Sequence, residues 1–177
     1  NGGTGTDTLI GGEGSDYYVV DGLEDVVIET GSAADYDEID SHISYTLVGQ
    51  NTIEGLALLG TADINATGNA LGNYLVGNSG NNILDGGSGA DTMLGDDGND
   101  TYYVDSTADT IYEFHTPGDT LNTSDKVYAS VAVNLNKFGS SGIENVYLTG
   151  TGDLTVAGNT LDNRIEGNTG HNTITGA

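Results

Sequence analysis

Short apolar runs are separated by loops of glycine, asparagine and aspartate along the whole chain. No apolar stripe with a period of 3.6 residues lasts for more than one turn, and glycine destabilises a helix interior. We therefore expect strands and loops throughout, and no helix. The runs predicted to be strands are Tyr17–Val20, Val26–Glu29, Glu38–Leu47, Thr101–Val104, Thr110–Phe114, Lys126–Leu135 and Val146–Thr149.

A polar residue ends these loops every nine residues, which is the mark of a repeat architecture. The members of this series are Asp7 and Asp16, then Asn73, Asn82, Asp91 and Asp100, and finally Asn163 and Asn172. An apolar residue stands two places after each of them. The side chains predicted to point into a narrow core are Leu9, Leu75, Leu84, Met93 and Tyr102.

The nine-residue period corresponds to half a coil, because about three residues of strand and six of loop make one side of it. Eighteen residues then make a full coil. Loops eighteen residues apart stack on the same side, separated by one strand spacing of about 4.8 Å. The spacing therefore predicts an all-β solenoid of stacked coils.

A longer period divides the chain into blocks. Gly14–Asp21 recurs as Gly98–Asp105 after 84 residues, and Ile53–Asn69 recurs as Ile143–Asn159 after 90 residues. A solenoid tolerates such insertions at its turns while its strands stay in step. We predict a first unit of metal-binding loops and β segment at residues 1–67. A second unit, with asparagine-rich loops in addition, spans 68–157, and a third begins at 158–177.

Acidic residues dominate the charge of the chain. There are 27 Asp and Glu residues against three Lys and Arg, so the formal net charge is -24 at pH 7. Such a charge repels nucleic acid and anionic lipid and opposes compaction of the bare chain. Divalent cations are natural partners for carboxylates, so we expect them to neutralise it.

Permanent disorder is the alternative for a charged chain that is only 36% hydrophobic. Ten tyrosines and a single proline argue against it, so we expect disorder only without divalent cations. The chain has no cysteine, and metals can replace disulfides in extracellular proteins. No apolar stretch approaches the roughly 18 residues of a membrane span. The sequence starts and stops within glycine-rich repeats, so we expect native flanking segments outside it.

Four nonapeptides share the pattern Gly-Gly-x-Gly-x-Asp-x-U-x, in which U is apolar. They are Gly2–Ile10, Gly11–Val19, Gly86–Leu94 and Gly95–Tyr103, the last with Asp96 at the second glycine. A weaker form with asparagine at the sixth place occupies Gly68–Val76, Gly77–Asp85, Gly158–Glu166 and Gly167–Thr175. The pattern resembles the RTX family, the haemolysin-type calcium-binding repeats.

The resemblance implies a parallel β-roll or β-helix solenoid with Ca²⁺ bound between stacked Gly/Asp-rich loops. It also implies export by a Gram-negative type I secretion system, and folding in millimolar external calcium. Localisation would then be extracellular, either secreted or at the cell surface.

The loop composition suits calcium on physical grounds. Glycine permits positive φ and turns backbone carbonyls inward, and the aspartate adds a carboxylate. Ca²⁺ takes six to eight oxygens at about 2.3–2.6 Å, which two stacked loops can supply. We expect several ions. The predicted ligands are Gly2, Gly3, Gly5, Asp7, Gly11, Gly12, Gly14, Asp16, Asp21, Asp25, Asn82, Gly86, Gly87, Gly89, Asp91, Gly95, Gly98, Asp100, Asp105 and Asp109.

A spacing of eighteen pairs these loops. Asp7 stacks with Asp25, and Asp91 with Asp109. The second loop of each pair carries another acid at the same place, Asp21 in the first and Asp105 in the second. Two carboxylates then face two, so these are the strongest predicted sites.

Asparagine in the sixth place predicts weaker sites, since its carbonyl coordinates without bringing charge. Asp100 stacks on Asn82, and Asp91 on Asn73. In the third block, Asn163 and Asn172 favour ion-free asparagine ladders.

The favoured function is a non-catalytic extracellular structural module that calcium folds after secretion. One alternative is a subunit of a filament, surface layer or adhesin that stacks end to end on other copies of itself. A further alternative is an accessory or catalytic module of a polysaccharide-modifying enzyme, with an extracellular polysaccharide as partner. No residue is predicted to be catalytic, because the neighbours Asp40, Ser41 and His42 would point to opposite faces of a strand.

Overall fold

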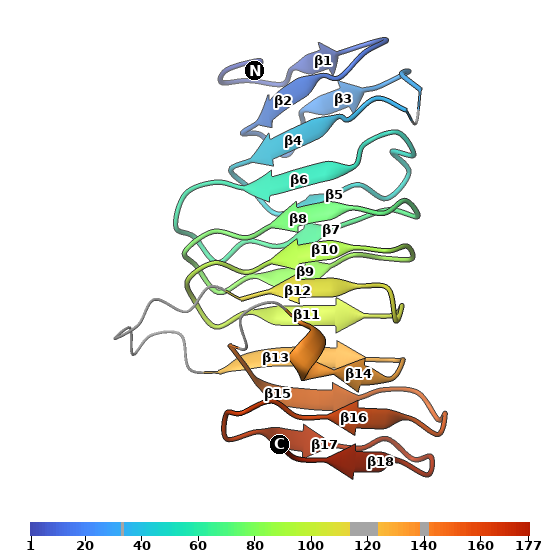
Figure 1. The fold of residues 1–177 in the computed structure, drawn as a ribbon. Helices are drawn as coiled ribbons and strands as arrows, with labels where there is room; N and C mark the ends of the chain where they lie inside the picture. The colour runs from blue at the N-terminus through green and yellow to red at the C-terminus, as the bar shows by residue number, and fades with distance from the viewer. Residues whose placement is uncertain (33, 114–123, 139–141) are drawn as a thin grey trace.

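A computed structural model describes residues 1–32, 34–113, 124–138 and 142–177. Over these residues the chain winds into a parallel β-solenoid of about eight turns, with strands stacked in chain order from one end to the other (Figure 1). All the strand pairs are parallel, for example β8 with β10. The predicted all-β solenoid is therefore confirmed.

Consecutive strands mostly alternate between two large sheets. The first sheet contains β2 (Tyr17–Val20), β4 (Glu38–Ser41), β6 (Gly55–Leu58), β8 (Tyr74–Val76), β10 (Thr92–Leu94) and β12 (Thr110–Tyr112). The second contains β5 (Tyr45–Thr46), β7 (Ala66–Thr67), β9 (Ile83–Asp85), β11 (Thr101–Val104), β13 (Asp125–Ala129), β15 (Ile143–Leu148) and β17 (Arg164–Glu166).

Two smaller sheets complete the stack. One pairs β1 (Thr8–Ile10) with β3 (Val26–Ile28), and the other contains β14 (Val133–Asn134), β16 (Thr155–Ala157) and β18 (Thr173–Thr175). Within the described ranges the helical structure is a single 3-10 turn, η1 (Leu135–Lys137). No helix in this part of the chain is long and apolar enough to cross a bilayer.

The register of the strands shows where the eighteen-residue coil holds. It holds between β8, β10 and β12, where Thr92 pairs with both Tyr74 and Thr110. It lengthens where β2 meets β4, since Tyr17 pairs with Glu38, and most of all where β11 meets β13, since Thr101 pairs with Lys126. The additional residues lie between the paired strands, so the strands stay in step.

Most strand predictions match the observed elements. Tyr17–Val20 and Thr101–Val104 are correct at both ends. Glu38–Leu47 is wrong as one strand, because the chain turns a corner between β4 and β5 and Ser41 Oγ donates to the Ile43 carbonyl at 2.8 Å. Lys126–Leu135 likewise divides into β13 and β14 and ends in η1.

The remaining strand predictions differ at their ends. Val26–Glu29 stops one residue earlier, at Ile28, and Val146–Thr149 covers the second half of β15 and one residue beyond it. In Thr110–Phe114, β12 ends at Tyr112, and Phe114 lies outside the described residues.

The core is thin, because each of the three-residue strands β8, β9, β10 and β12 contributes one buried side chain, and it has the predicted members. Leu75, Leu84, Met93 and Tyr102 are fully buried, and Leu9 is partly buried against the same cluster. Because neighbours on a strand face opposite ways, the ring of Tyr103 points outward, where it stacks on Tyr128 with centroids 5.5 Å apart. Such a thin core contributes less hydrophobic stabilisation than a globular one, so the loops matter for folding.

Candidate metal centres

Four loops with the full nonapeptide pattern, here called the aspartate loops, connect the strands of the solenoid. They span Gly2–Asp7, Gly11–Asp16, Gly86–Asp91 and Gly95–Asp100. Each ends on its aspartate, directly before the first residue of β1, β2, β10 or β11. The first glycine lies beneath the carboxylate: a Cβ at Gly86 would overlap the carboxylate of Asp91.

Positive φ angles shape the same loops, as expected from their glycines. Gly3 and Gly87 have φ of 82° and 73° at the second position of their loops. Asp96 fills that position in the last aspartate loop with φ of 71°, a conformation that aspartate tolerates better than most residues.

Carboxylates connect neighbouring coils by accepting backbone hydrogen bonds. The Asn73 N–H donates to Asp91 Oδ1 at 2.7 Å, and the Asp91 N–H donates to Asp109 Oδ1 at 3.1 Å. The N–H groups of Asp7 and Asn82 donate in the same way to Asp25 at 3.0 Å and Asp100 at 2.7 Å. These four contacts confirm the predicted stacking at eighteen residues.

Asp16 and Asp100 stack at a different spacing. The Asp16 N–H donates to Asp37 Oδ1, and the Asp100 N–H to Asp125 Oδ1, each at 2.7 Å. The partners are 21 and 25 residues away. A fixed spacing of eighteen would have placed Ala34 beside Asp16. The partners of these two aspartates in the following coil could therefore not be found by counting.

In each aspartate loop, the second oxygen of the aspartate that ends the loop is left without a donor. Within the described ranges, Oδ2 of Asp7, Asp16, Asp91 and Asp100 is buried and has no hydrogen-bond partner. Leaving a buried charged oxygen unsatisfied costs free energy, so such positions are expected to be met by a bound ion or a proton.

The four loops of the weaker form have a different internal structure, and we call them the asparagine loops. They share the sequence Gly-Asn-x-x-x-Asn, at residues 68–73, 77–82, 158–163 and 167–172. The N–H of Asn69 donates to Asn73 Oδ1 at 2.7 Å, which closes the loop. The Asn73 side-chain amide donates to the Ile53 carbonyl of the preceding coil at 3.2 Å. Amide hydrogens therefore satisfy inward-facing oxygens here.

The third block repeats this arrangement. Asn163 donates to the Ile143 carbonyl at 3.1 Å and to Asn159 Oδ1 at 2.9 Å. The predicted ladder, in which asparagine side chains bond one another along the stack, is therefore wrong. The Asn163 amide donates to a main-chain carbonyl of the adjacent coil and to an asparagine of its own loop. Asn82, predicted as a ligand, accepts from the Asn78 N–H and donates to the Ile64 carbonyl, each at 2.7 Å.

The carboxylates of Asp25 and Asp109 stack where predicted, but backbone N–H groups already satisfy both of their oxygens. Asp109 Oδ1 accepts from Asp91, and its Oδ2 accepts from the N–H groups of Ser106 at 3.0 Å and Asp105 at 3.2 Å. Asp25 makes the equivalent contacts, and the hydrogen bond from the Asp7 N–H is the main cause that lowers its pKa. The side chains of Asp21 and Asp105 are exposed. Calcium binding at these four residues stays a prediction.

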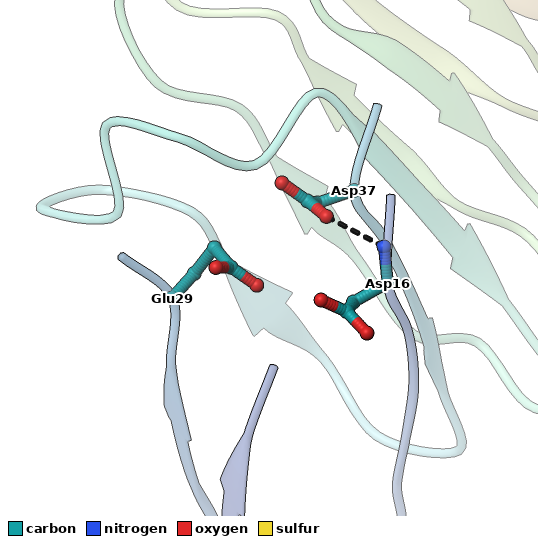
Figure 2. Close-up of side chains that lie close together, drawn as sticks. All are labelled: Asp16, Glu29 and Asp37. Atoms are coloured by element: carbon teal, nitrogen blue, oxygen red, sulfur yellow. Dashed lines mark hydrogen bonds between the residues drawn. The ribbon is translucent and has the colours of Figure 1, made fainter. Parts of the chain in front are cut away.

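The structure gathers carboxylates in two other places. Asp16, Glu29 and Asp37 form one cluster, whose side chains face a common space (Figure 2). Its ligand atoms lie within 4.8 Å of one another.

An equivalent cluster contains Asp100, Glu113 and Asp125, with ligand atoms within the same distance. Glu113 stands eighteen residues after Gly95, the first position of an aspartate loop, and Glu29 stands eighteen after Gly11. Neither glutamate was predicted from the sequence to be a ligand, although their shared shift of 84 residues is visible there.

Comparison with known families agrees with the loop geometry. The model of the RTX calcium-binding nonapeptide repeat matches the chain in four copies, over residues 1–27, 67–102 and 157–177. The chain carries RTX calcium-binding repeats. Searches of curated proteins and of solved structures gave no match.

The RTX match and the carboxylate clusters overlap only in part. It covers the aspartate loops and the asparagine loops, whereas Glu29, Asp37, Glu113 and Asp125 lie outside it. The clusters therefore join an RTX aspartate to acids from segments that do not follow the repeat.

Burial raises the pKa of the RTX aspartates that lie deepest in the solenoid. Desolvation raises the pKa of Asp91 to about 7 and that of Asp100 to about 9. In the second cluster it also raises the pKa of Asp125 to about 8, with the negative charge of Glu113 adding to the effect. The protein alone thus compensates these charges poorly, which is the condition under which a divalent cation binds.

Proposed function

We propose that this chain is a non-catalytic structural module of a secreted protein, folded by several calcium ions that bind in its aspartate loops after export. The observation that carries the proposal is the difference between the two kinds of loop. All four aspartate loops have a buried carboxylate oxygen without a donor, at Asp7, Asp16, Asp91 and Asp100.

The asparagine loops serve as an internal comparison. At the same loop position, Asn73 and Asn163 donate their amide hydrogens to carbonyls of the adjacent coil. The neutral amide thus satisfies its loop without a ligand, while the carboxylate requires a positive charge. Carboxylate and carbonyl oxygens are the ligands that Ca²⁺ prefers, and calcium is the ion of this repeat family.

Net charge and the thin core support a role for calcium in folding. With a net charge of -24, the folded chain concentrates like charges that the unfolded chain keeps apart. An ion that binds only the folded state stabilises it by mass action. RTX repeat proteins are typically secreted, so folding that waits for external calcium suits passage in an unfolded state.

The free-calcium midpoint of folding tests the proposal. Metal-stripped chain is titrated with buffered calcium while circular dichroism records β structure. We expect a largely unfolded chain in chelator and a cooperative transition between about 10⁻⁴ and 10⁻³ M, the range of extracellular calcium modules. A β spectrum unchanged by chelator, or a midpoint below about 10⁻⁶ M, would contradict folding after export.

A further inference from the structure

The second carboxylate cluster is the most highly charged buried place in the described part of the chain. Asp100, Glu113 and Asp125 each have no solvent exposure. Oδ2 of Asp100 and Oδ2 of Asp125 have no hydrogen-bond partner there, and the space above Gly95 is bounded by Asp100 Oδ2, Glu113 Oε2 and the hydroxyl of Tyr102.

Unsatisfied buried oxygens concentrate in the two clusters. Seven buried side-chain atoms without partners occur in the described residues, and four of them belong to Asp16, Asp37, Asp100 and Asp125. The ion pair found in these ranges joins Arg164 to Glu166 at the surface, and the charge of Lys126 only partly offsets the burial of Asp125. Three carboxylates within 4.8 Å repel one another strongly in a buried site, so a positive partner is required.

The two clusters are built alike although their loops differ in length. In each, a tyrosine hydroxyl donates to the glutamate, Tyr18 to Glu29 and Tyr102 to Glu113. The aspartate of the following coil is 21 residues away in the first cluster and 25 in the second, yet it accepts the same backbone hydrogen bond. Although the spacing differs, an aspartate carboxylate occupies the equivalent position in both clusters.

We propose that Asp100, Glu113 and Asp125 form a cation site of a second kind, in which one calcium ion is held mainly by side-chain carboxylates of two stacked loops. Asp16, Glu29 and Asp37 form its counterpart in the first block. The site extends the proposed calcium binding beyond the repeat, because a glutamate replaces the first loop glycine and brings charge where the repeat has only backbone. Each site includes the aspartate of the last loop in a run of aspartate loops. Its ligands carry more negative charge than those of a loop that offers one carboxylate and backbone carbonyls.

The clusters differ in burial, which predicts an order of affinity. Asp16 and Glu29 are half-buried, whereas every member of the second cluster is buried. Carboxylates that are already desolvated and fixed bind a cation more strongly, so the second site is filled first.

Calorimetric titration of the metal-stripped full chain with calcium chloride tests the site. Glu113→Gln keeps the shape and an oxygen that can accept from Tyr102, but removes one charge. We expect it to weaken one calcium site by at least about tenfold. Glu166→Gln, which removes an exposed carboxylate outside both clusters, should leave all the sites unchanged.

A further variant separates this proposal from the function on which it rests. Asp91→Asn removes a carboxylate from an aspartate loop outside both clusters. If Asp91→Asn weakens calcium binding and Glu113→Gln does not, the cluster holds protons and the proposal falls, while the proposed function stands. If neither variant changes binding, both fall. Should Glu113→Gln fail to fold in calcium, Glu29→Gln in the more exposed cluster decides by the same criterion.

Discussion

Asp91→Asn should change stability in opposite directions with and without calcium. Asp91 Oδ1 accepts from Asn73, and the asparagine keeps that oxygen. Its Oδ2 is buried without a donor, so in the metal-free chain an ionised Asp91 is destabilising. Replacing the charge with an amide should raise the free energy of unfolding there by about 1 kcal/mol, the lower end of the usual cost of an unsatisfied buried group, because a pKa of about 7 leaves Asp91 partly protonated at neutral pH.

Calcium reverses the sign. An ion at one hundred times its dissociation constant stabilises the folded state by about 2.7 kcal/mol, which the variant forfeits. Set against the gain of about 1 kcal/mol from removing the buried charge, the net loss is about 1.7 kcal/mol, which for a chain of this size corresponds to a thermal midpoint lower by roughly 3–7 °C. Thermal unfolding in calcium measures this half of the prediction. For the metal-free half, an osmolyte such as TMAO drives folding, and the variant should need less of it.

Asp153→Asn is the matched control, since it removes an exposed carboxylate. It should shift neither midpoint by more than about 0.5 kcal/mol. Equal destabilisation by Asp91→Asn in calcium and in chelator would refute the reasoning, because it would make Asp91 a structural hydrogen-bond acceptor and not a ligand.

Three further predictions concern pH and the loops. Because burial raises the pKa of Asp100 to about 9 and of Asp125 to about 8, the folded metal-free chain binds more protons than the unfolded chain between about pH 4 and 9. Its stability in chelator should therefore rise as the pH falls from 8 to 5, and a fall measured by osmolyte-induced folding would contradict this. Gly95→Ala places a Cβ against Asp100 and Tyr102, so calorimetry should show weakened calcium binding, whereas Gly176→Ala, with open space around it, should not. Asn163→Ala removes one of two side-chain donors to the Ile143 carbonyl and the oxygen that accepts from the Asn159 N–H, so it should lower stability by about 1–3 kcal/mol in urea unfolding with calcium stoichiometry unchanged; loss of an ion would show that the asparagine loops bind calcium.

The periodicity in the sequence was sufficient to predict the fold. The apolar residue two places after each loop end, such as Leu75 or Met93, is buried because the strand that follows is short and its alternation is fixed. The stacking of Asp91 on Asp109 also follows from counting, since no residue is inserted between their strands.

The gathering of the carboxylates could not be obtained in this way. Asp37 and Asp125 follow segments with additional residues, and a count does not tell which residue after such an insertion will stand opposite the aspartate of the preceding coil. Asp25 and Asp109 illustrate the opposite case. They stack where predicted, but the adjacent coil donates an N–H to Oδ1 of each, and their own short loops donate N–H groups to Oδ2.

The location of calcium in crystals of the loaded chain, found from its anomalous scattering, tests the central claim most directly. The account predicts ions beside the unpartnered Oδ2 atoms of the aspartate loops, at Asp7, Asp16, Asp91 and Asp100. It predicts none within the asparagine loops, where amide hydrogens satisfy the inward-facing oxygens. Ions beside Asn73 or Asn163, or calcium-loaded crystals with no ion at the aspartate loops, would contradict it.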